Sequence, residues 1–383
     1  MKVLFDYQTF VQQHYGGISK CFVEIIKHFP SDLSYEISVN KSKNVHLLQS
    51  NLVPNVSIPF SDKTDFLKFP FLGTRKAYSF INKCPLIPTV EKINKKYAIG
   101  RLLNGDFDIF HPTYFDDYFL NYLGGKPFVL TIHDMIPELF LKDPNNFQIR
   151  MKKKLAPLAS AIIAVSENTK SDVIKLLKIP EEKIHVIYHG CPEKKVVKHM
   201  LNMDYPYFLY VGQRNGYKNF QSLVKDYKIV HSYFPNIKLV CTASTFNKVE
   251  NKMIRANGLE DSIVHVDVDD EKLVSLYSYA LALVYPSCYE GFGIPLLEAF
   301  TYGCPVILNN KSCFPEIASD AALYFDSDGE QSNISEFLLY FLNHPEIREV
   351  LVEKGTQRSQ LYCWEKSANQ LIEVYQSVLK QNK

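Results

Sequence analysis

Two glutamates on either side of a glycine-containing loop are the residues of this sequence best suited to chemistry. Glu290 precedes the loop and Glu298 follows it, while Gly291 and Gly293 have no side chains that would block access to the backbone N–H groups between them. A carboxylate accepts two hydrogen bonds in fixed geometry, which suits the hydroxyls of a sugar or a ribose. The alternative is an ordinary strand-to-helix turn that carries two solvated glutamates.

The chain on both sides of this loop predicts the elements that would position the two carboxylates. The apolar run 280–285 predicts a buried strand that ends at Pro286, and Pro295 suits the first turn of a helix over 294–300. Glu298 would then lie about one turn into the helix, on the face nearest the loop. The carboxyl ends of strands in an open α/β sheet form the ligand crevice, and a helix N-terminus there suits a phosphate.

Two glycines and a histidine in the first half of the chain lie, like the glycine-containing loop, next to the start of a predicted helix or the end of a predicted strand. Gly16 and Gly17 directly precede a predicted helix over 19–29, so their backbone amides could bind an anion, although a plain flexible turn is equally compatible. His133 follows the predicted strand 128–132, where a side chain of near-neutral pKa suits hydrogen bonding to a sugar or proton transfer. A lone histidine at such a place is more often structural.

Two cations follow the first predicted strand of the second half. Gly212 ends the strand 207–211, and Arg214 and Lys218 come shortly afterwards. An arginine fork and a mobile ammonium suit a diphosphate, whereas the alternative is a solvated loop with two ordinary cations. Three aspartates at 267–270 could suggest a metal, but they directly precede a helix, where acidic residues are favoured in any case. We therefore expect no metal.

Composition limits the class of protein. The 383 residues suggest two or three domains, and 46% hydrophobic with 22% charged residues is typical of a globular protein. The net charge of +2 gives no reason to expect nucleic acid, and the eight cysteines include no C-x-x-C pair. No apolar run is long enough to span a bilayer, so we expect a cytoplasmic protein, at most peripheral on the membrane.

One segment carries an unusual mixture of residues. The stretch 63–101 interleaves cations with aromatic side chains, and Asp65 and Glu91 are its only acids. This composition suits an anionic membrane surface or a lipid-pyrophosphate acceptor. A solvated face over a small core explains it more simply, and single-stranded nucleic acid, which uses similar residues, has no other support in the sequence.

The spacing of the two glutamates resembles a known signature. Glu290 and Glu298, with seven residues between them and Gly-Phe-Gly-Ile-Pro inside, resemble the motif of retaining, nucleotide-sugar-dependent glycosyltransferases of family 4, also called group 1. The runs 131–138, 211–219 and 285–317 carry the strongest resemblance.

This resemblance implies a GT-B fold, in which two Rossmann-like doubly wound α/β domains enclose a deep cleft. The implied parts are an acceptor-binding domain over residues 1–192 and a linker over 193–205. A nucleotide-sugar-binding domain over 206–363 follows, and then a helix over 364–383 that crosses back to the first domain.

The resemblance also assigns roles to individual residues. The implied catalytic residues are Glu290, His133, Arg214 and Lys218, and Asp134 and Glu138 face the acceptor. The implied donor-binding residues are Gly16, Gly17, Gly212, Arg214, Lys218, Glu290, Gly291, Phe292, Gly293, Ile294, Pro295 and Glu298. No metal ligand and no cofactor other than the nucleotide-sugar co-substrate are implied.

The function implied is transfer of a hexosyl group to a hydroxyl with retention of configuration. His-Asp-x-Ile-Pro-Glu at 133–138 together with Gly-Tyr-Lys-Asn at 216–219 resembles bacterial mannosyltransferases of surface-polysaccharide assembly, which favours GDP-mannose as donor. The acceptor would be a glycan or a lipid-linked oligosaccharide. The alternatives are a nucleotide-sugar-binding module without turnover, or an epimerase, for which we expect further acidic residues around the sugar.

Overall fold

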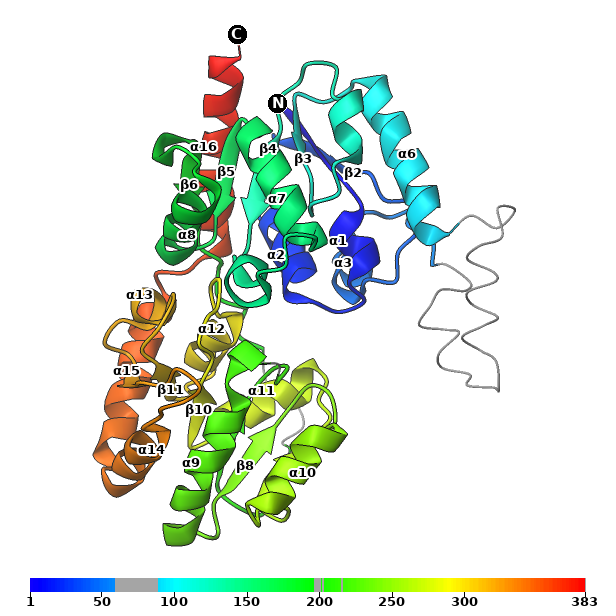
Figure 1. Ribbon diagram of the computed structural model, residues 1–383. Coiled ribbons are helices and arrows are strands. Elements are labelled where there is room, and N and C mark those ends of the chain that lie inside the picture. The colour runs from blue at the N-terminus through cyan, green and yellow to red at the C-terminus, as the bar shows by residue number, and fades with distance from the viewer. Residues whose placement is uncertain (59–88, 196–200, 202, 215, 383) are drawn as a thin grey trace, which may run out of the picture.

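The computed structural model describes residues 1–58, 89–195, 201, 203–214 and 216–382. Over these residues the chain forms two α/β domains, each built on parallel strands with helices on both sides (Figure 1). The first domain uses the N-terminal half of the chain and the second uses the C-terminal half. The GT-B architecture expected from the sequence is therefore confirmed.

The N-terminal domain contains strands in the spatial order β2-β1-β3 and β4-β5-β6, and a bridge between Phe110 and Phe128 links the two groups. The strands are β1 Lys2–Phe5, β2 Ser34–Ile37, β3 Ile109–His111, β4 Val129–Ile132, β5 Ala161–Ala164 and β6 Ile184–Val186. The helices are α1 Gln8–Gln12, α2 Gly17–Lys27, α3 Val45–Ser50, α6 Val90–Asn104, α7 Phe147–Leu158 and α8 Glu167–Leu177. The short turn η2 covers Pro137–Leu141.

The C-terminal domain has a six-stranded parallel sheet in the order β12-β11-β10-β7-β8-β9. Its strands are β7 Tyr207–Tyr210, β8 Lys238–Cys241, β9 Ile263–His265, β10 Ala282–Tyr285, β11 Val306–Asn309 and β12 Leu323–Phe325. Its helices are α9 Phe220–Tyr233, α10 Lys248–Ala256, α11 Asp270–Tyr279, α12 Ile294–Thr301, α13 Phe314–Ala318, α14 Ile334–Asn343 and α15 Glu346–Ser359. Strand order reverses between β7 and β10, so the crevice expected of a doubly wound sheet lies between the loops that follow these two strands.

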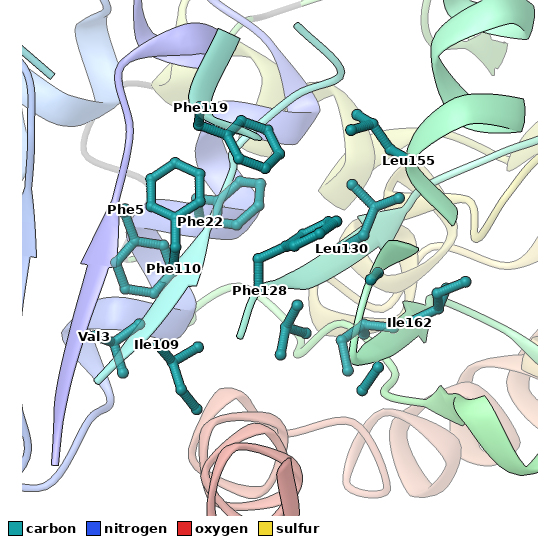
Figure 2. Close-up of a cluster of buried hydrophobic side chains, with 14 of the residues drawn as sticks. Val3, Phe5, Phe22, Ile109, Phe110, Phe119, Phe128, Leu130, Leu155 and Ile162 are labelled. Atoms are coloured by element: carbon teal, nitrogen blue, oxygen red, sulfur yellow. The ribbon is translucent and has the colours of Figure 1, made fainter. Parts of the chain in front are cut away.

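The strands form where apolar side chains run without interruption. Every residue of β7, β10 and β11 is buried, as expected for parallel strands with helices on both faces. The N-terminal core shows the same principle, because β1, β3 and β4 contribute Phe5, Phe110 and Leu130 to one apolar cluster (Figure 2). Burial of one such side chain contributes about 1.5–3 kcal/mol of transfer free energy.

The last helix connects the two domains. α16, Trp364–Gln381, follows α15 of the C-terminal domain but runs beside the N-terminal domain (Figure 1). Leu371, Val374 and Tyr375 of this helix belong to the N-terminal core, and the Tyr375 hydroxyl lies 2.6 Å from His111 Nδ1. Its amphipathic pattern in the sequence thus corresponds to a face buried against the first domain.

The basic and aromatic segment and the predicted linker are each described only in part. Helix α6 occupies the end of the basic and aromatic segment, capped by the Thr89 side chain and ended by Gly105 with a φ of 68°, and Arg101 on it pairs with Glu36 at 2.6 Å. Residues 63–88 of that segment lie outside the described residues, as does part of the predicted linker. None of the helices in the described ranges has the length and apolar character needed to cross a bilayer.

Candidate active site

The loops at the reversal point of the C-terminal sheet bring two predicted site residues together. Lys218 follows β7 and Glu290 follows β10, and Lys218 Nζ lies 2.5 Å from Glu290 Oε1. The two side chains are only 16% and 10% exposed, so solvent screens this ion pair weakly. Ser312 fixes the backbone of Glu290, because its hydroxyl donates to Glu290 O at 2.7 Å and accepts from Glu290 N at 3.2 Å.

The glycine loop that follows Glu290 leads directly into α12. Gly293 caps this helix with a φ of 91°, in the left-handed region that favours glycine, and Pro295 lies in the first turn as predicted. Glu298 lies one turn in, where Lys20 Nζ donates to Oε1 at 2.9 Å and the Tyr277 hydroxyl donates to Oε2 at 3.0 Å. Burial disfavours the ammonium, but the Glu298 carboxylate outweighs it and raises the pKa of Lys20 above its ordinary value.

The N-termini of two helices from different domains lie next to each other. A side-chain carbon placed on Gly17, the first residue of α2, would lie 3.6 Å from Cδ1 of Ile294, the first residue of α12. Gly16 caps α2 without a side-chain hydrogen bond. Each helix start carries a partial positive charge, and at α2 one of the N–H groups without a helical partner, that of Ser19, donates to Gln13 Oε1 at 3.1 Å. The arrangement therefore suits a phosphate group held from both sides.

A cavity of about 340 Å³ adjoins these helix ends. Its lining comes from both domains, with Tyr15 and Lys20 on one side and Asp270, Tyr277 and Glu298 on the other. The Tyr15 hydroxyl donates to Asp270 Oδ1 at 2.6 Å across this space. The volume is within the range of small-molecule pockets, and the lining mixes apolar side chains with several charged ones, which suits a polar ligand.

His133 lies at the contact between the domains. A side-chain carbon on Gly291 would lie 1.7 Å from His133 O, so only glycine allows the loop to approach this closely. The His133 ring stacks near His189 at 5.9 Å, and Nε2 is buried without a hydrogen-bond partner among the described residues. Burial lowers the pKa of His133 to about 4, so the imidazole is neutral at pH 7.

Several hydrogen bonds connect the domains beside the glycine loop. The hydroxyls of Ser166 and Thr169 donate to Gly291 O at 2.7 and 3.3 Å. Glu316 accepts hydrogen bonds from the N–H groups of Glu167 and Asn168 at the start of α8, at 2.7 and 3.1 Å. A carboxylate at a helix N-terminus is electrostatically favourable, so α8 is capped by the other domain. The described cleft is thus closed at this point.

Arg214 is placed differently from the expectation. Its guanidinium pairs with Glu250 at 3.0 Å and donates to the carbonyls of Thr242, at 2.9 Å, and Ser244. The side chain is 1% exposed, and Phe246 packs against it at 4.8 Å. The Glu250 carboxylate and the carbonyls after the carboxyl end of β8 therefore occupy most of the guanidinium donors. We therefore leave Arg214 out of the diphosphate site.

We expect Arg214→Gln to reduce stability more than nucleotide affinity. Removing one partner of a buried ion pair costs about 3–5 kcal/mol, because Glu250 and two carbonyls would lose their donor. Denaturant unfolding would show a lower midpoint, while nucleoside-diphosphate affinity, measured below the unfolding transition, would stay within about threefold. Unchanged stability with lost diphosphate affinity would return Arg214 to the site.

The two residues predicted to face the acceptor, Asp134 and Glu138, differ in their accessibility. Glu138 pairs with Lys152 at 3.0 Å, and both side chains are buried, so its carboxylate neutralises an interior cation. Lys152 also donates to Asp134 O at 2.8 Å. The Asp134 carboxylate accepts from Ile136 N at 3.0 Å and remains 30% exposed. Asp134 is therefore accessible to an acceptor, whereas Glu138 is not.

Two functional candidates were missed by the sequence prediction. Lys20 lies one turn after the Gly16-Gly17 pair, so a cation at that spacing was an available signal. Tyr277 lies inside α11 among apolar residues, and nothing in the sequence distinguishes it from a core tyrosine. Two predicted donor residues remain. Gly212 follows β7 and has a φ of 116°. The ring of Phe292 lies with its centroid 4.9 Å from that of His189.

Two Rossmann-like domains, with helix starts and two carboxylates where the domains meet, correspond to the GT-B class of glycosyltransferases. Two family models match the chain, Glycosyltransferase Family 4 over residues 52–195 and Glycosyl transferases group 1 over residues 193–358. Together they cover most of the chain, which therefore belongs to the family 4, or group 1, glycosyltransferases.

Characterised relatives and solved structures agree with this assignment. O-antigen chain mannosyltransferase B of Escherichia coli is 28% identical over 267 residues, covering 64% of this chain and 69% of the relative. O-antigen chain mannosyltransferase RfbU of Salmonella typhimurium is 31% identical over 209 residues, covering 53% and 58% respectively, so the match spans little more than half of that protein.

Among solved structures, Anabaena HepE in complex with UDP and glucose superposes with a TM-score of 0.70 at 15% identity, covering 98% of this chain and all of that one. Sucrose-phosphate synthase from Thermosynechococcus elongatus gives the same TM-score at 16% identity, and both chains are fully covered. At these identities the superpositions show the fold.

Proposed function

We propose that the chain transfers a mannosyl group from GDP-mannose to a hydroxyl of a glycan or lipid-linked oligosaccharide, with retention of configuration, in the synthesis of a bacterial surface polysaccharide such as the O-antigen of lipopolysaccharide. The observation that carries the proposal is the Lys218–Glu290 pair at the reversal point of the C-terminal sheet, where the loop after β10 leads into α12. The names of the two O-antigen relatives support the choice of mannose and of acceptor.

Charge in the cleft would change when the donor binds. Lys218 is neutralised by Glu290 in this structure, and a diphosphate would compete for its ammonium. The Glu290 carboxylate would then be free to accept hydrogen bonds from sugar hydroxyls, while Lys218 offsets the negative charge that develops on the departing diphosphate. His133 would contribute its unpartnered Nε2 to a donor-sugar hydroxyl.

The reaction itself needs no protein nucleophile. The bond between the anomeric carbon and the phosphate oxygen breaks, the acceptor oxygen bonds to the same face of that carbon, and the acceptor proton passes to the departing phosphate. Glu290 and Glu298 hold donor hydroxyls in this scheme, in contrast to the acid and nucleophile pair of a retaining glycosidase. Positive charge from Lys218 and two helix ends supports a metal-independent reaction.

The proposal is tested by incubating the protein with GDP-, UDP- and dTDP-sugars and lipid-linked or free glycans in the presence of EDTA. We expect transfer from GDP-mannose without added metal, and a new α-linkage in the product by proton NMR. A β-linked product would contradict retention, and a requirement for Mg²⁺ would contradict metal independence. Nucleotide binding without transfer to any acceptor would favour a binding module.

Membrane contact is part of the proposal because a lipid-linked acceptor is embedded in a bilayer. The α7 surface, defined by Leu141, Lys142, Phe147, Arg150 and Lys153, combines exposed apolar side chains with exposed cations. Leu141 at the end of η2 and Phe147 at the start of α7 are 60% and 48% exposed. Such a combination suits the inner, anionic face of the cytoplasmic membrane.

The α7 surface lies close to the cleft. Phe140, the residue before Leu141, packs against Tyr217 and Tyr289 of the C-terminal domain, with ring centroids 5.4 and 6.1 Å apart. The same η2 turn contains Glu138 and follows Asp134. A membrane bound at this surface would therefore present a lipid-linked glycan beside the acceptor side of the cleft.

We expect Arg150→Gln/Lys153→Gln to weaken binding to phosphatidylglycerol-containing vesicles about 30-fold, since each of the two cations contributes about 1 kcal/mol at an anionic surface. Leu141→Ser/Phe147→Ser should weaken it comparably through lost apolar burial. The matched control Tyr340→Ser/Val350→Ser removes exposed apolar residues of α14 and α15 and should change nothing. Vesicle sedimentation is the measurement, and equal binding by all variants would contradict this surface.

A further inference from the structure

The ion pair between Lys20 and Glu298 joins the two domains inside the cavity. Lys20 comes from α2 of the N-terminal domain and Glu298 from α12 of the C-terminal domain, and their side chains are 28% and 13% exposed. Tyr277 holds the other carboxylate oxygen from within the C-terminal domain. Each oxygen of Glu298 thus has one fixed hydrogen-bond donor, and one of these two donors comes from the other domain.

The two hydrogen bonds hold the Glu298 carboxylate in one orientation and leave hydrogen-bond acceptor sites on both of its oxygens unused. A carboxylate has about four acceptor sites on its two oxygens, and Lys20 and Tyr277 use one on each. One site per oxygen remains, which matches two neighbouring hydroxyls such as those of a ribose. Burial and the adjacent Glu298 raise the pKa of Tyr277 well above its ordinary value, so its hydroxyl keeps its proton and remains a donor.

The other groups that face Lys20 do not offer it a better partner. Asp270 also lines the cavity, and it accepts from Tyr15 at 2.6 Å and from Lys195 at 3.1 Å. Glu24, one turn after Lys20 on α2, pairs with Lys27 at 3.0 Å. Lys20 therefore has Glu298 as its close counter-ion among the described residues. Without Lys20, Glu298 would face the cavity with Tyr277 as its remaining fixed donor.

We propose that Lys20 is a positioning residue that holds the Glu298 carboxylate oriented toward the ribose 2′- and 3′-hydroxyls of the donor nucleotide. The inference rests on the proposed function, because it requires that a nucleotide occupies this cavity. It adds that the acceptor domain takes part in ribose recognition through an ion pair that forms only when the domains are in contact.

The test measures binding of GDP and UDP, each beside its 2′-deoxy and 3′-deoxy analogue, by isothermal titration calorimetry. The proteins are wild type, Lys20→Met, Glu298→Gln and the control Lys175→Met, which removes an exposed lysine of α8. Wild type should prefer the ribonucleotide about tenfold, the scale of one hydrogen bond to a charged group. Lys20→Met should bind the ribonucleotide about tenfold more weakly and lose this preference, as Glu298→Gln should.

Two further variants separate positioning from folding. Lys20→Arg keeps a cation at the site and should restore part of the ribose preference, and thermal unfolding should show all the variants folded at the assay temperature. The double variant Lys20→Met/Glu298→Gln should be no worse than either single variant, since both act through the same carboxylate.

Four results would overturn the inference. Tighter nucleotide binding by Lys20→Met would mean that Lys20 competes with the ribose for Glu298. Weaker nucleotide binding by Lys20→Met with an unchanged preference for the ribonucleotide would mean that Lys20 acts on a part of the nucleotide other than the ribose. If wild type bound no nucleoside diphosphate at all, the proposed function would fail together with the inference, whereas normal wild-type binding with an unaffected Lys20→Met would defeat the inference alone.

Discussion

Replacing Glu290 by glutamine is expected to slow sugar transfer roughly 100- to 1000-fold, the loss seen when one preorganised electrostatic group is removed from an active site. The substitution keeps the size of the side chain but leaves Lys218 without its counter-ion at 2.5 Å. The glutamine amide could still reach a sugar hydroxyl, but it would carry no charge to stabilise a cationic transition state. Initial rates at saturating donor, with equilibrium donor affinity measured separately, distinguish this effect from weaker binding.

A matched control is available on the exposed face of α15. Glu349→Gln makes the same chemical change at an exposed position and should leave transfer and stability unchanged. A diphosphate should bind Glu290→Gln as well as wild type or better, because the competing carboxylate charge is gone. If Glu290→Gln transferred sugar within a factor of two of wild type, the assignment of the cleft as the active site would be wrong.

Replacing Gly291 by alanine is expected to lower transfer by about 100-fold, the scale associated with a misplacement of about 1 Å. The added carbon would lie 1.7 Å from His133 O, which is far inside van der Waals contact. Local adjustment is restricted because Gly291 O accepts hydrogen bonds from Ser166 and Thr169. The loop and the His133 segment would have to separate, which opens the cleft at the donor sugar.

Small-angle scattering should accordingly show a larger radius of gyration for Gly291→Ala, and the rate should fall more than the affinity for a nucleoside diphosphate. Gly100→Ala is the control, since a side-chain carbon at this position of α6 meets nothing within 4 Å. Wild-type rates in Gly291→Ala would show that the contact between Gly291 and His133 is dispensable for transfer.

The parts of the site that the sequence predicted are those that depend on one strand and the loop after it. Glu290 and Lys218 follow β10 and β7, and the parallel order of a doubly wound sheet brings such loops together wherever two strands are neighbours. Pro295 and the loop glycines likewise mark the start of α12 through local backbone preferences. The fold could be predicted for the same reason, since alternating buried strands and amphipathic helices are local patterns.

The parts that could not be predicted depend on how the domains meet or on the direction of one side chain. Lys20 and Glu298 are 278 residues apart, and no local pattern indicates their contact. Arg214 has the residue type expected of a phosphate ligand, but the carbonyls after β8 and Glu250 determine where its guanidinium points. Glu138 similarly follows the motif histidine, yet the buried Lys152 takes its carboxylate.

The most direct test of the central claim, that the cleft between the domains turns over a nucleotide sugar, compares wild type with Glu290→Gln for release of nucleoside diphosphate from GDP-mannose and from UDP- and dTDP-sugars. The same nucleotides should raise the melting temperature of both proteins, because ligand binding stabilises the native state. We predict release by wild type from one class of donor, with release by Glu290→Gln reduced at least about 100-fold. Stabilisation without release by wild type, even with glycan acceptors present, would contradict the catalytic account.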